Sequence, residues 1–428
     1  MAPRKPGLNT AEPCFKLRKF DQLRNFADFR PPHPVSRRYA FRLPAGVTDL
    51  RIRKQPFRDM NQTVDFAAQA EDAGAARLYM QRVADGLAAV ERIRGKVAQL
   101  LLAQSLDASW LERIGQAVED LLQLAREYPD LSLYFLLNEK VNNPAQYSAL
   151  HSVCCATMVV LGAAWLGWPE DELRGVAGAA LTMNVAMGEL QDRLARQLEP
   201  PSMGQREIIR HHAERGAEAL EKIGVSDPLW LQAVREHHLV HDDGEADSLE
   251  PGQRAAELLR RVDVYAAKLS SRRTRQALTP ALAARGALMG PADQPDAMGA
   301  TLLRVLGLYP PGTYVELADG ELGVVIERGN RAHTPLVASL RRGDGRVLLV
   351  PQARDTALRA HAVRRGVDAA AVHVRPGHQL VLKTRLQLGL PAALVPAPAV
   401  APEDEAAENE PALAPADDLD DLGPDSPV

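Results

Sequence analysis

The chain is poor in the features that mark secreted, membrane and nucleic-acid-binding proteins. It has three cysteines among 428 residues, Cys14, Cys154 and Cys155, so a disulfide framework is excluded and a reducing, cytoplasmic location is expected. The polar, basic N-terminus lacks the apolar core of a signal peptide. The most apolar stretch, 153–168, is short and ends at Pro169, so no transmembrane segment is predicted. A net charge of −4 gives no sign of nucleic-acid binding.

Several common sequence signatures are absent as well. The chain has no P-loop, no zinc-finger spacing of cysteines, no nucleophile elbow and no clear internal repeat. Its length is sufficient for two or three domains. The function must therefore be sought in the pattern of its remaining histidines and carboxylates.

Composition divides the chain into five regions. Residues 1–60 are basic and rich in Pro and Arg, which indicates either a solvated arm or a docking segment for an acidic partner or a membrane surface. An N-terminal helical region (61–140) and a helical domain (141–300) follow, because apolar residues recur there at intervals of three, four and seven. Residues 308–386 predict a small β-rich, barrel-like domain, and 387–428, without Lys or Arg, predict a disordered acidic tail. The predicted fold is mainly α.

Turn and capping residues place the individual elements. Ser109 and Ser202 each begin a capping-box pattern, Gly224 predicts a helix end, and Asp227 before Pro228 predicts a helix start. A further helix is expected from about Gln253 to Ser270. Strands are predicted at 313–317, 323–327 and 346–350.

Residues with the chemistry of metal ligands fall in the helical domain. Imidazoles and carboxylates are the usual ligands of divalent iron, manganese and zinc. The candidates, expected on four successive helices of a bundle, are His151, His212, His237, His238 and Asp263. The alternative is that these histidines bind no metal and are only packed in the core or exposed to solvent. Asp263 could equally pair with Arg260, Arg261 or a nearby histidine.

The order and spacing of motifs around these residues resemble those of one phosphohydrolase family. The motifs are Tyr147 to Ser152, Leu161 to Trp168, Ala179-Ala180-Leu181, His212 to Gly216, His237-His238 and Val262-Asp263-Val264-Tyr265. Over 145–285 the chain resembles the HD-GYP family, the cyclic di-GMP phosphodiesterase branch of the HD superfamily. The segment from Tyr309 to Thr313 also resembles the small domain that follows the catalytic domain in a subset of that family. The resemblance implies an HD-domain-like helical bundle and a divalent-metal site.

The chain departs from the family pattern at its centre. The signature His-Asp-Ile-Gly-Lys reads Met183-Asn184-Val185-Ala186-Met187, and the Gly-Tyr-Pro loop is replaced in 242–247. In addition, Leu239 stands where the family has Glu, and Ala266 where it has Asp. The resemblance implies that the signature His ligates a metal and that the signature Asp bridges two metals.

These substitutions remove specific chemistry. The thioether of Met183 is a poor ligand for hard metals, and the neutral amide of Asn184 cannot supply a bridging charge. Met187 removes a Lys that could hold a substrate phosphate. We predict that Met183, Met187 and Met203 fill core space instead. Three histidines could still hold one metal, so the alternatives are one divalent iron, manganese or zinc ion, or no metal.

Three functional hypotheses follow from this sequence. The first is a degenerate, catalytically impaired HD-GYP homologue in bacterial cyclic di-GMP signalling, which binds a cyclic dinucleotide or a signalling protein. The second is an active phosphohydrolase with one metal on His212, His237 and His238. The third is a regulatory unit in which the β-rich domain binds the ligand and the helical bundle forms a homodimer.

Overall fold

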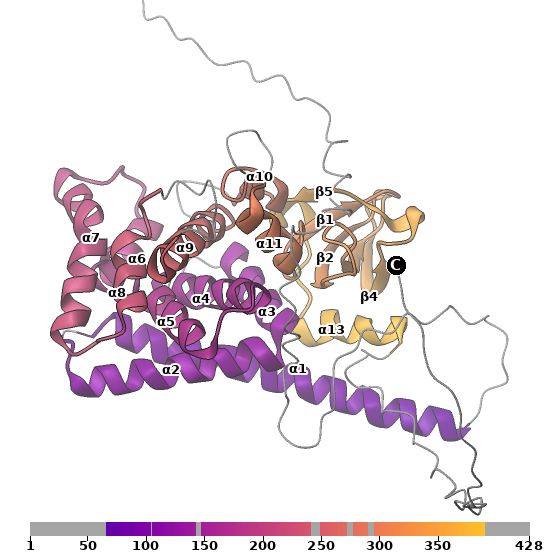
Figure 1. Cartoon of the computed structure of the whole chain (residues 1–428). Coiled ribbons are helices and arrows are strands. Elements are labelled where there is room, and N and C mark those ends of the chain that lie inside the picture. Colours follow the sequence, from indigo (N-terminus) through magenta and orange to yellow (C-terminus); the bar gives the residue numbers. More distant parts are fainter. Residues whose placement is uncertain are drawn as a thin grey trace, which may run out of the picture. The chain divides into compact units, whose positions relative to one another are not determined.

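The computed structural model describes residues 66–103, 105–142, 147–240, 249–271, 277–289 and 295–389, without the side chains of 66–72 and 140–142. The predicted basic arm, the loop at 242–247, His241 and the acidic tail from residue 390 lie outside the described residues. The described chain is mostly helical and carries a small antiparallel sheet in its last quarter (Figure 1).

The helices occupy the first three quarters of the described chain. Their bounds are α1 Phe66–Leu101, α2 Ala108–Glu127, α3 Pro129–Asn142, α4 Tyr147–Trp165, α5 Glu170–Thr182, η2 Val185–Met187, α6 Gly188–Arg196, α7 Met203–Lys222, α8 Pro228–Glu236, α9 Pro251–Lys268, α10 Pro280–Arg285 and α11 Ala297–Leu306. Helices α12 Ala369–Val372 and α13 His378–Lys383 and the short turns η4 Arg359–His361 and η5 Thr384–Leu388 accompany the sheet.

Local capping explains where several helices begin and end. Ser202 and Gln205 form the predicted capping box of α7, and the Asp227 side chain accepts hydrogen bonds from the first amides of α8. Gly224, with φ of +105°, follows α7 as predicted. The prediction for Ser109 was wrong: Asp107 is the N-cap of α2, because its carboxylate accepts from the amide of Trp110.

Helix α4 forms the centre of the helical region. It packs against α1, α3, α5 and α9, and its described residues are almost all buried. Small residues permit these close approaches; for example, Gly162 lies against Leu302 and Leu258. Helix α4 is also long and apolar enough to cross a membrane, although 83% of its most apolar window is buried inside the protein. Burial of this kind is that of a core helix, so α4 gives no clear transmembrane segment.

Five antiparallel strands form one open sheet. They are β1 Tyr314–Leu317, β2 Leu322–Glu327, β3 Leu336–Arg341, β4 Val347–Asp355 and β5 Val363–Val367, in the spatial order β4-β3-β2-β1-β5. The barrel-like prediction was wrong, because β4 and β5 are the two edges and do not pair with each other. The sequence patterns found β1, β2 and the start of β4, but they did not find β3 or β5.

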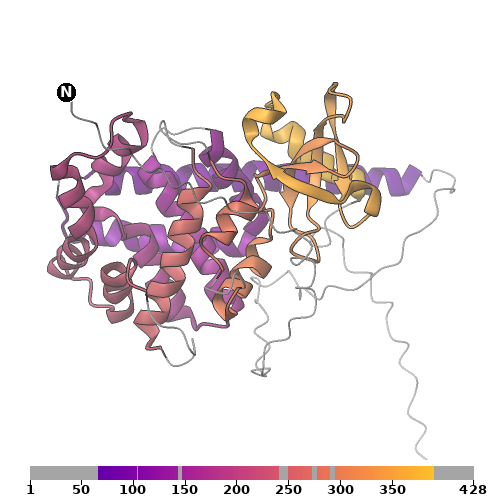
Figure 2. The ribbon, with the colours of Figure 1, turned by 90° about the horizontal axis from the view of Figure 1, so that it is seen from above.

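The sheet region is attached to the helical region by side-chain contacts. Arg328 in the sheet region forms an ion pair with Asp130 of α3, with 2.6 Å between Nε and Oδ1. Asn138 donates to the Tyr314 hydroxyl at 3.1 Å, and the Tyr79 hydroxyl of α1 donates to the carbonyl of Leu382 in α13. Helix α1 thus contacts both α4 and α13 (Figure 2).

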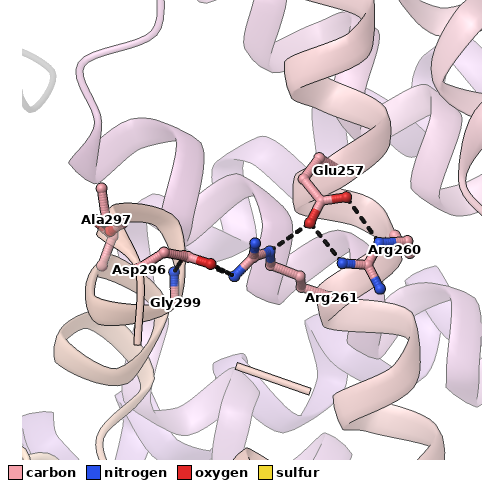
Figure 3. A network of polar contacts seen from close by, with 7 residues as sticks. Glu257, Arg260, Arg261, Asp296, Ala297 and Gly299 are labelled. Atoms are coloured by element: carbon pink, nitrogen blue, oxygen red, sulfur yellow. Dashed lines mark hydrogen bonds and ion pairs between the residues drawn. The ribbon is translucent and has the colours of Figure 1, made fainter. Parts of the chain in front are cut away.

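A buried ionic network fastens α9 to α11. Glu257 and Arg261 are 1% and 5% exposed, and the carboxylate of Glu257 accepts hydrogen bonds from both Arg260 and Arg261 (Figure 3). Arg261 also pairs with Asp296, which caps α11 by accepting from the amide of Gly299. The network fixes the helix that carries Asp263, while leaving Asp263 itself free of both arginines.

Candidate metal centre

The five predicted ligands come from four helices and lie in two groups. His151 belongs to α4, His212 to α7 and Asp263 to α9, while His237 and His238 follow the last residue of α8. The helices are not successive as predicted, because α5, η2 and α6 lie between α4 and α7. The first group is His212, His237 and His238; the second is His151, Asp263 and Cys155.

The three histidines of the first group point their Nε2 atoms at one another. The Nε2 of His212 lies 3.3 Å from the Nε2 of His237 and 3.3 Å from the Nε2 of His238. His212 and His237 are buried, whereas His238 is exposed at the edge of the group. We call this set the three-histidine cluster. The spacing of these histidines in the sequence could not by itself predict this arrangement.

Hydrogen bonds on the far side of two rings fix the protons. The Nδ1 of His212 lies 2.7 Å from the carbonyl oxygen of Ile209, and the Nδ1 of His237 lies 2.7 Å from that of Val234. A carbonyl can only accept, so each Nδ1 carries a proton and donates. In the neutral rings each Nε2 is therefore a lone pair directed into the cluster. The lone pairs of His212 and His237 thus face each other and repel, unless a proton or a cation lies between them.

A proton is the less favourable of these two solutions. Burial, with a smaller electrostatic influence of His238, lowers the pKa of His237 to about 3. Burial likewise lowers the pKa of His212, although its bond to Ile209 opposes the shift. These rings are therefore neutral near pH 7 and available as metal ligands.

The geometry of the cluster fits a single divalent transition metal. Two imidazole nitrogens at about 2.0–2.1 Å from one tetrahedral metal are separated by roughly 3.3 Å. Both Nε2 separations from His212 have this value. The backbone carbonyls that hold the Nδ1 protons are the outer partners that metal-binding histidines normally have. The donor set is thus suited to one metal with three protein ligands.

In the second group, the histidine and the carboxylate bind each other. The Nε2 of His151 lies 2.7 Å from Oδ1 of Asp263, so Asp263 pairs with a histidine, which is one of the alternatives from the sequence. Burial alone raises the pKa of Asp263, but the hydrogen bond and charge of His151, with smaller effects of His237 and His238, hold it well below its ordinary value. The ring of Tyr147 stacks on His151 at 5.3 Å between centroids.

Sequence reasoning missed Cys155 as a member of this second group. Its Sγ lies 3.7 Å from the Nε2 of His151. The signal was present in the sequence, because residues four apart on a helix occupy the same face and Cys155 follows His151 by four. The adjacent Cys154 is also buried and belongs to the hydrophobic core.

The segment that contains Met183 and Asn184 lies against α7, the helix that carries His212. Met183 and Asn184 are buried, and the backbone of Met183 lies close to Gly216, one helical turn after His212. Met183 fills core space as predicted, and Met187 is half-buried. The prediction for Met203 was wrong, since it is 83% exposed at the start of α7.

The fold and the site define a mainly helical protein with a histidine-rich candidate metal centre and an attached antiparallel sheet. A cyclic di-GMP phosphodiesterase from Pseudomonas aeruginosa is 26% identical to this chain over 327 aligned residues, which cover 70% of this chain and 77% of that protein. No protein-family model matches the chain. No solved structure matches it either. A distant relative of this chain is therefore a cyclic di-GMP phosphodiesterase, in accord with the sequence resemblance.

Proposed function

We propose that this chain is an HD-GYP-type protein of cyclic di-GMP signalling that binds one divalent transition metal and holds a cyclic dinucleotide there without efficient hydrolysis. The observation that carries the proposal is the convergence of three Nε2 atoms beside a carboxylate that is already paired with His151. The name of the distant relative supplies the ligand class. Three imidazoles can hold one metal, so we propose a single-metal site. The neutral amide of Asn184 cannot bridge to a second metal, so we propose no second site.

Charge distinguishes the binding of a phosphodiester, which this site supports, from its rapid cleavage. A divalent cation on the three histidines would polarise a phosphoryl oxygen and lower the pKa of a coordinated water. His212 and His237 would hold it with rings oriented by Ile209 and Val234. Asn184 offers no anionic oxygen to bridge a second cation, and Met187 offers no charge to a phosphate. The chain therefore keeps a means of binding a phosphodiester and lacks most of what speeds its cleavage.

Metal content of the purified chain tests the first part of the proposal. About one equivalent of iron, manganese or zinc is expected by elemental analysis after reconstitution. The exposed His238 is the best position to change, because His238→Ala removes a ligand without opening the core. The matched control is His211→Ala, which removes the neighbouring exposed histidine that pairs with Glu207. Loss in His238→Ala and retention in His211→Ala support the site; a metal-free wild-type protein overturns it.

Cyclic di-GMP tests the second part. Calorimetric binding to metal-loaded protein is expected to weaken strongly in His238→Ala and to persist in His211→Ala. Turnover followed by chromatography of the nucleotide products is expected to be absent or very slow. No binding of cyclic di-GMP to a metal-loaded protein would overturn the ligand assignment while leaving the metal site intact.

A slow single-metal phosphohydrolase is the second candidate. The pair of His151 and Asp263 favours it, because a carboxylate 2.7 Å from an imidazole makes that imidazole a better proton acceptor. Metal-dependent turnover that disappears in both His151→Gln and His238→Ala would decide for the enzyme. A cytoplasmic location, a homodimer and the absence of nucleic-acid binding stay predictions from the sequence.

A further inference from the structure

A cationic pocket lies at one end of the sheet, within the region from 314 to 371. It has a volume of about 390 Å³. The strand register places four of its residues in one row across the sheet: Arg341 pairs with Leu322, Leu322 with Glu316, and Glu316 with Arg365. Directly opposed residues in antiparallel strands project from the same face, so these side chains rise together. We call this pocket, with Arg342, the arginine pocket.

The arginines of this pocket carry more positive charge than their neighbours neutralise. Arg341 donates to the carbonyls of Gly345 and Ala371, which are neutral acceptors, at 3.0 and 3.3 Å. The Arg342 side chain is exposed, and within the described residues its guanidinium forms no hydrogen bond or ion pair; only its backbone is hydrogen-bonded, to Arg346 and Gly345. Cations held by carbonyls keep their full charge and attract an anion.

The remaining carboxylate at the pocket is shared. Glu316 forms ion pairs with both Arg364 and Arg365, at 3.0 and 2.5 Å. One carboxylate thus serves two guanidinium groups. Asp368 at the pocket rim caps α12 by accepting from the amide of Ala370, and it keeps its charge. Three arginines against two carboxylates leave the pocket lining with an excess of one positive charge.

Two turns that need glycine form one wall of the pocket. Gly320 has φ of +83°, and a Cβ on Gly343 would lie 2.5 Å from the carbonyl oxygen of Asp319. The β1–β2 and β3–β4 turns can approach this closely only because both positions lack a side chain. This contact fixes the end of β3, from which Arg341 and Arg342 project.

We propose that the arginine pocket binds the phosphate group of a small phosphate ester, at a site separate from the three-histidine cluster. Guanidinium groups match phosphate because their planar N–H pairs donate to two oxygens at once. Arg341 and Arg365 stand three strands apart, about 14 Å between backbones, and arginine side chains are long enough to converge over the space between them. Leu322 and Glu316 both lie between them: Glu316 is paired with Arg365, and Leu322 supplies an apolar floor for the rest of the ligand.

Calorimetric titration of the full chain with inorganic phosphate, GMP and cyclic di-GMP tests this proposal. Arg342→Ala with Arg365→Ala is expected to raise the Kd of the bound probe at least about tenfold, because each change removes a charge-assisted contact. The matched control is Arg359→Ala, an exposed arginine of the same region that does not line the pocket. It should leave the Kd unchanged. Raised salt should weaken binding.

The metal-site variant separates this proposal from the proposed function. In His238→Ala the arginine-pocket binding should persist, even if cyclic di-GMP no longer binds at the three-histidine cluster. Tighter binding of one ester than of inorganic phosphate would identify the part of the ligand beyond the phosphate. The proposal is overturned if none of the three probes binds, or if the double arginine variant, folded by circular dichroism, binds as well as wild type. It is also overturned if all binding vanishes in His238→Ala.

Discussion

Acid should destabilise the metal-free protein through His237. This ring is fully buried, and its pKa is lowered to about 3 from an ordinary value of 6.5. Between these values the unfolded chain binds the proton and the folded chain does not, so stability is complete above pH 6.5 and is lost as the pH falls toward 3. At pH 5 the loss is about 1.4 kcal/mol for each of 1.5 pH units, or roughly 2 kcal/mol. His212 contributes in the same direction.

Urea unfolding of chelator-treated protein at pH 7.5 and pH 5 measures this effect. A His237→Gln variant should lose less stability between the two values than wild type, by roughly 2 kcal/mol, because glutamine does not titrate. His211→Gln provides the control at an exposed histidine, and its pH dependence should follow wild type. Equal pH dependence in wild type and His237→Gln would refute the argument that burial keeps this ring neutral.

Three further predictions concern packing, charge and the metal bridge. Gly178→Ala should destabilise the protein by about 1–3 kcal/mol and weaken metal binding, because a Cβ there would lie 2.5 Å from the ring of Trp230 in α8. Gly115→Ala is the control: a Cβ at this position has no neighbour within 4 Å, so the change should stabilise α2. Thermal unfolding measures both effects. Glu257→Gln should cost roughly 1–3 kcal/mol in urea unfolding, because it removes the buried charge that Arg260 and Arg261 share, while Arg261 keeps its pair with Asp296; an unchanged midpoint would contradict this. Asn184→Asp should raise the metal content above one equivalent, and unchanged elemental analysis would count against Asn184 as the lost bridge.

The helical part was predictable because its signals are local. The Asp227-Pro228 start of α8, the capping box at Ser202 and the stop at Gly224 each act within one turn of chain. The error at Ser109 is equally local: Asp107, two residues earlier, is a charged acceptor for the amide of Trp110, so the helix begins before Ser109. Strands β3 and β5 were missed because a strand is defined by its partners, which lie far away in the sequence.

The site was predictable as a set of residues and not as an arrangement. The sequence indicated His212 and His237 as ligands, but their 3.3 Å approach depends on how α7 packs against α8. The pairing of Asp263 was left open between arginines and a histidine. It was decided by Glu257, whose carboxylate engages both arginines one turn earlier on α9. No single segment of the sequence determines such distances between helices.

Two rings of the three-histidine cluster are oriented within their own helices and do not depend on the residues at 183 and 184. His212 is oriented by Ile209 three residues earlier in α7, and His237 by Val234 three residues earlier in α8. Neither bond involves Met183 or Asn184. A bridging carboxylate, by contrast, orders two metals at once and has no substitute when it becomes an amide. The proposed function therefore expects a single-metal binding geometry at the three-histidine cluster and no second, bridged metal.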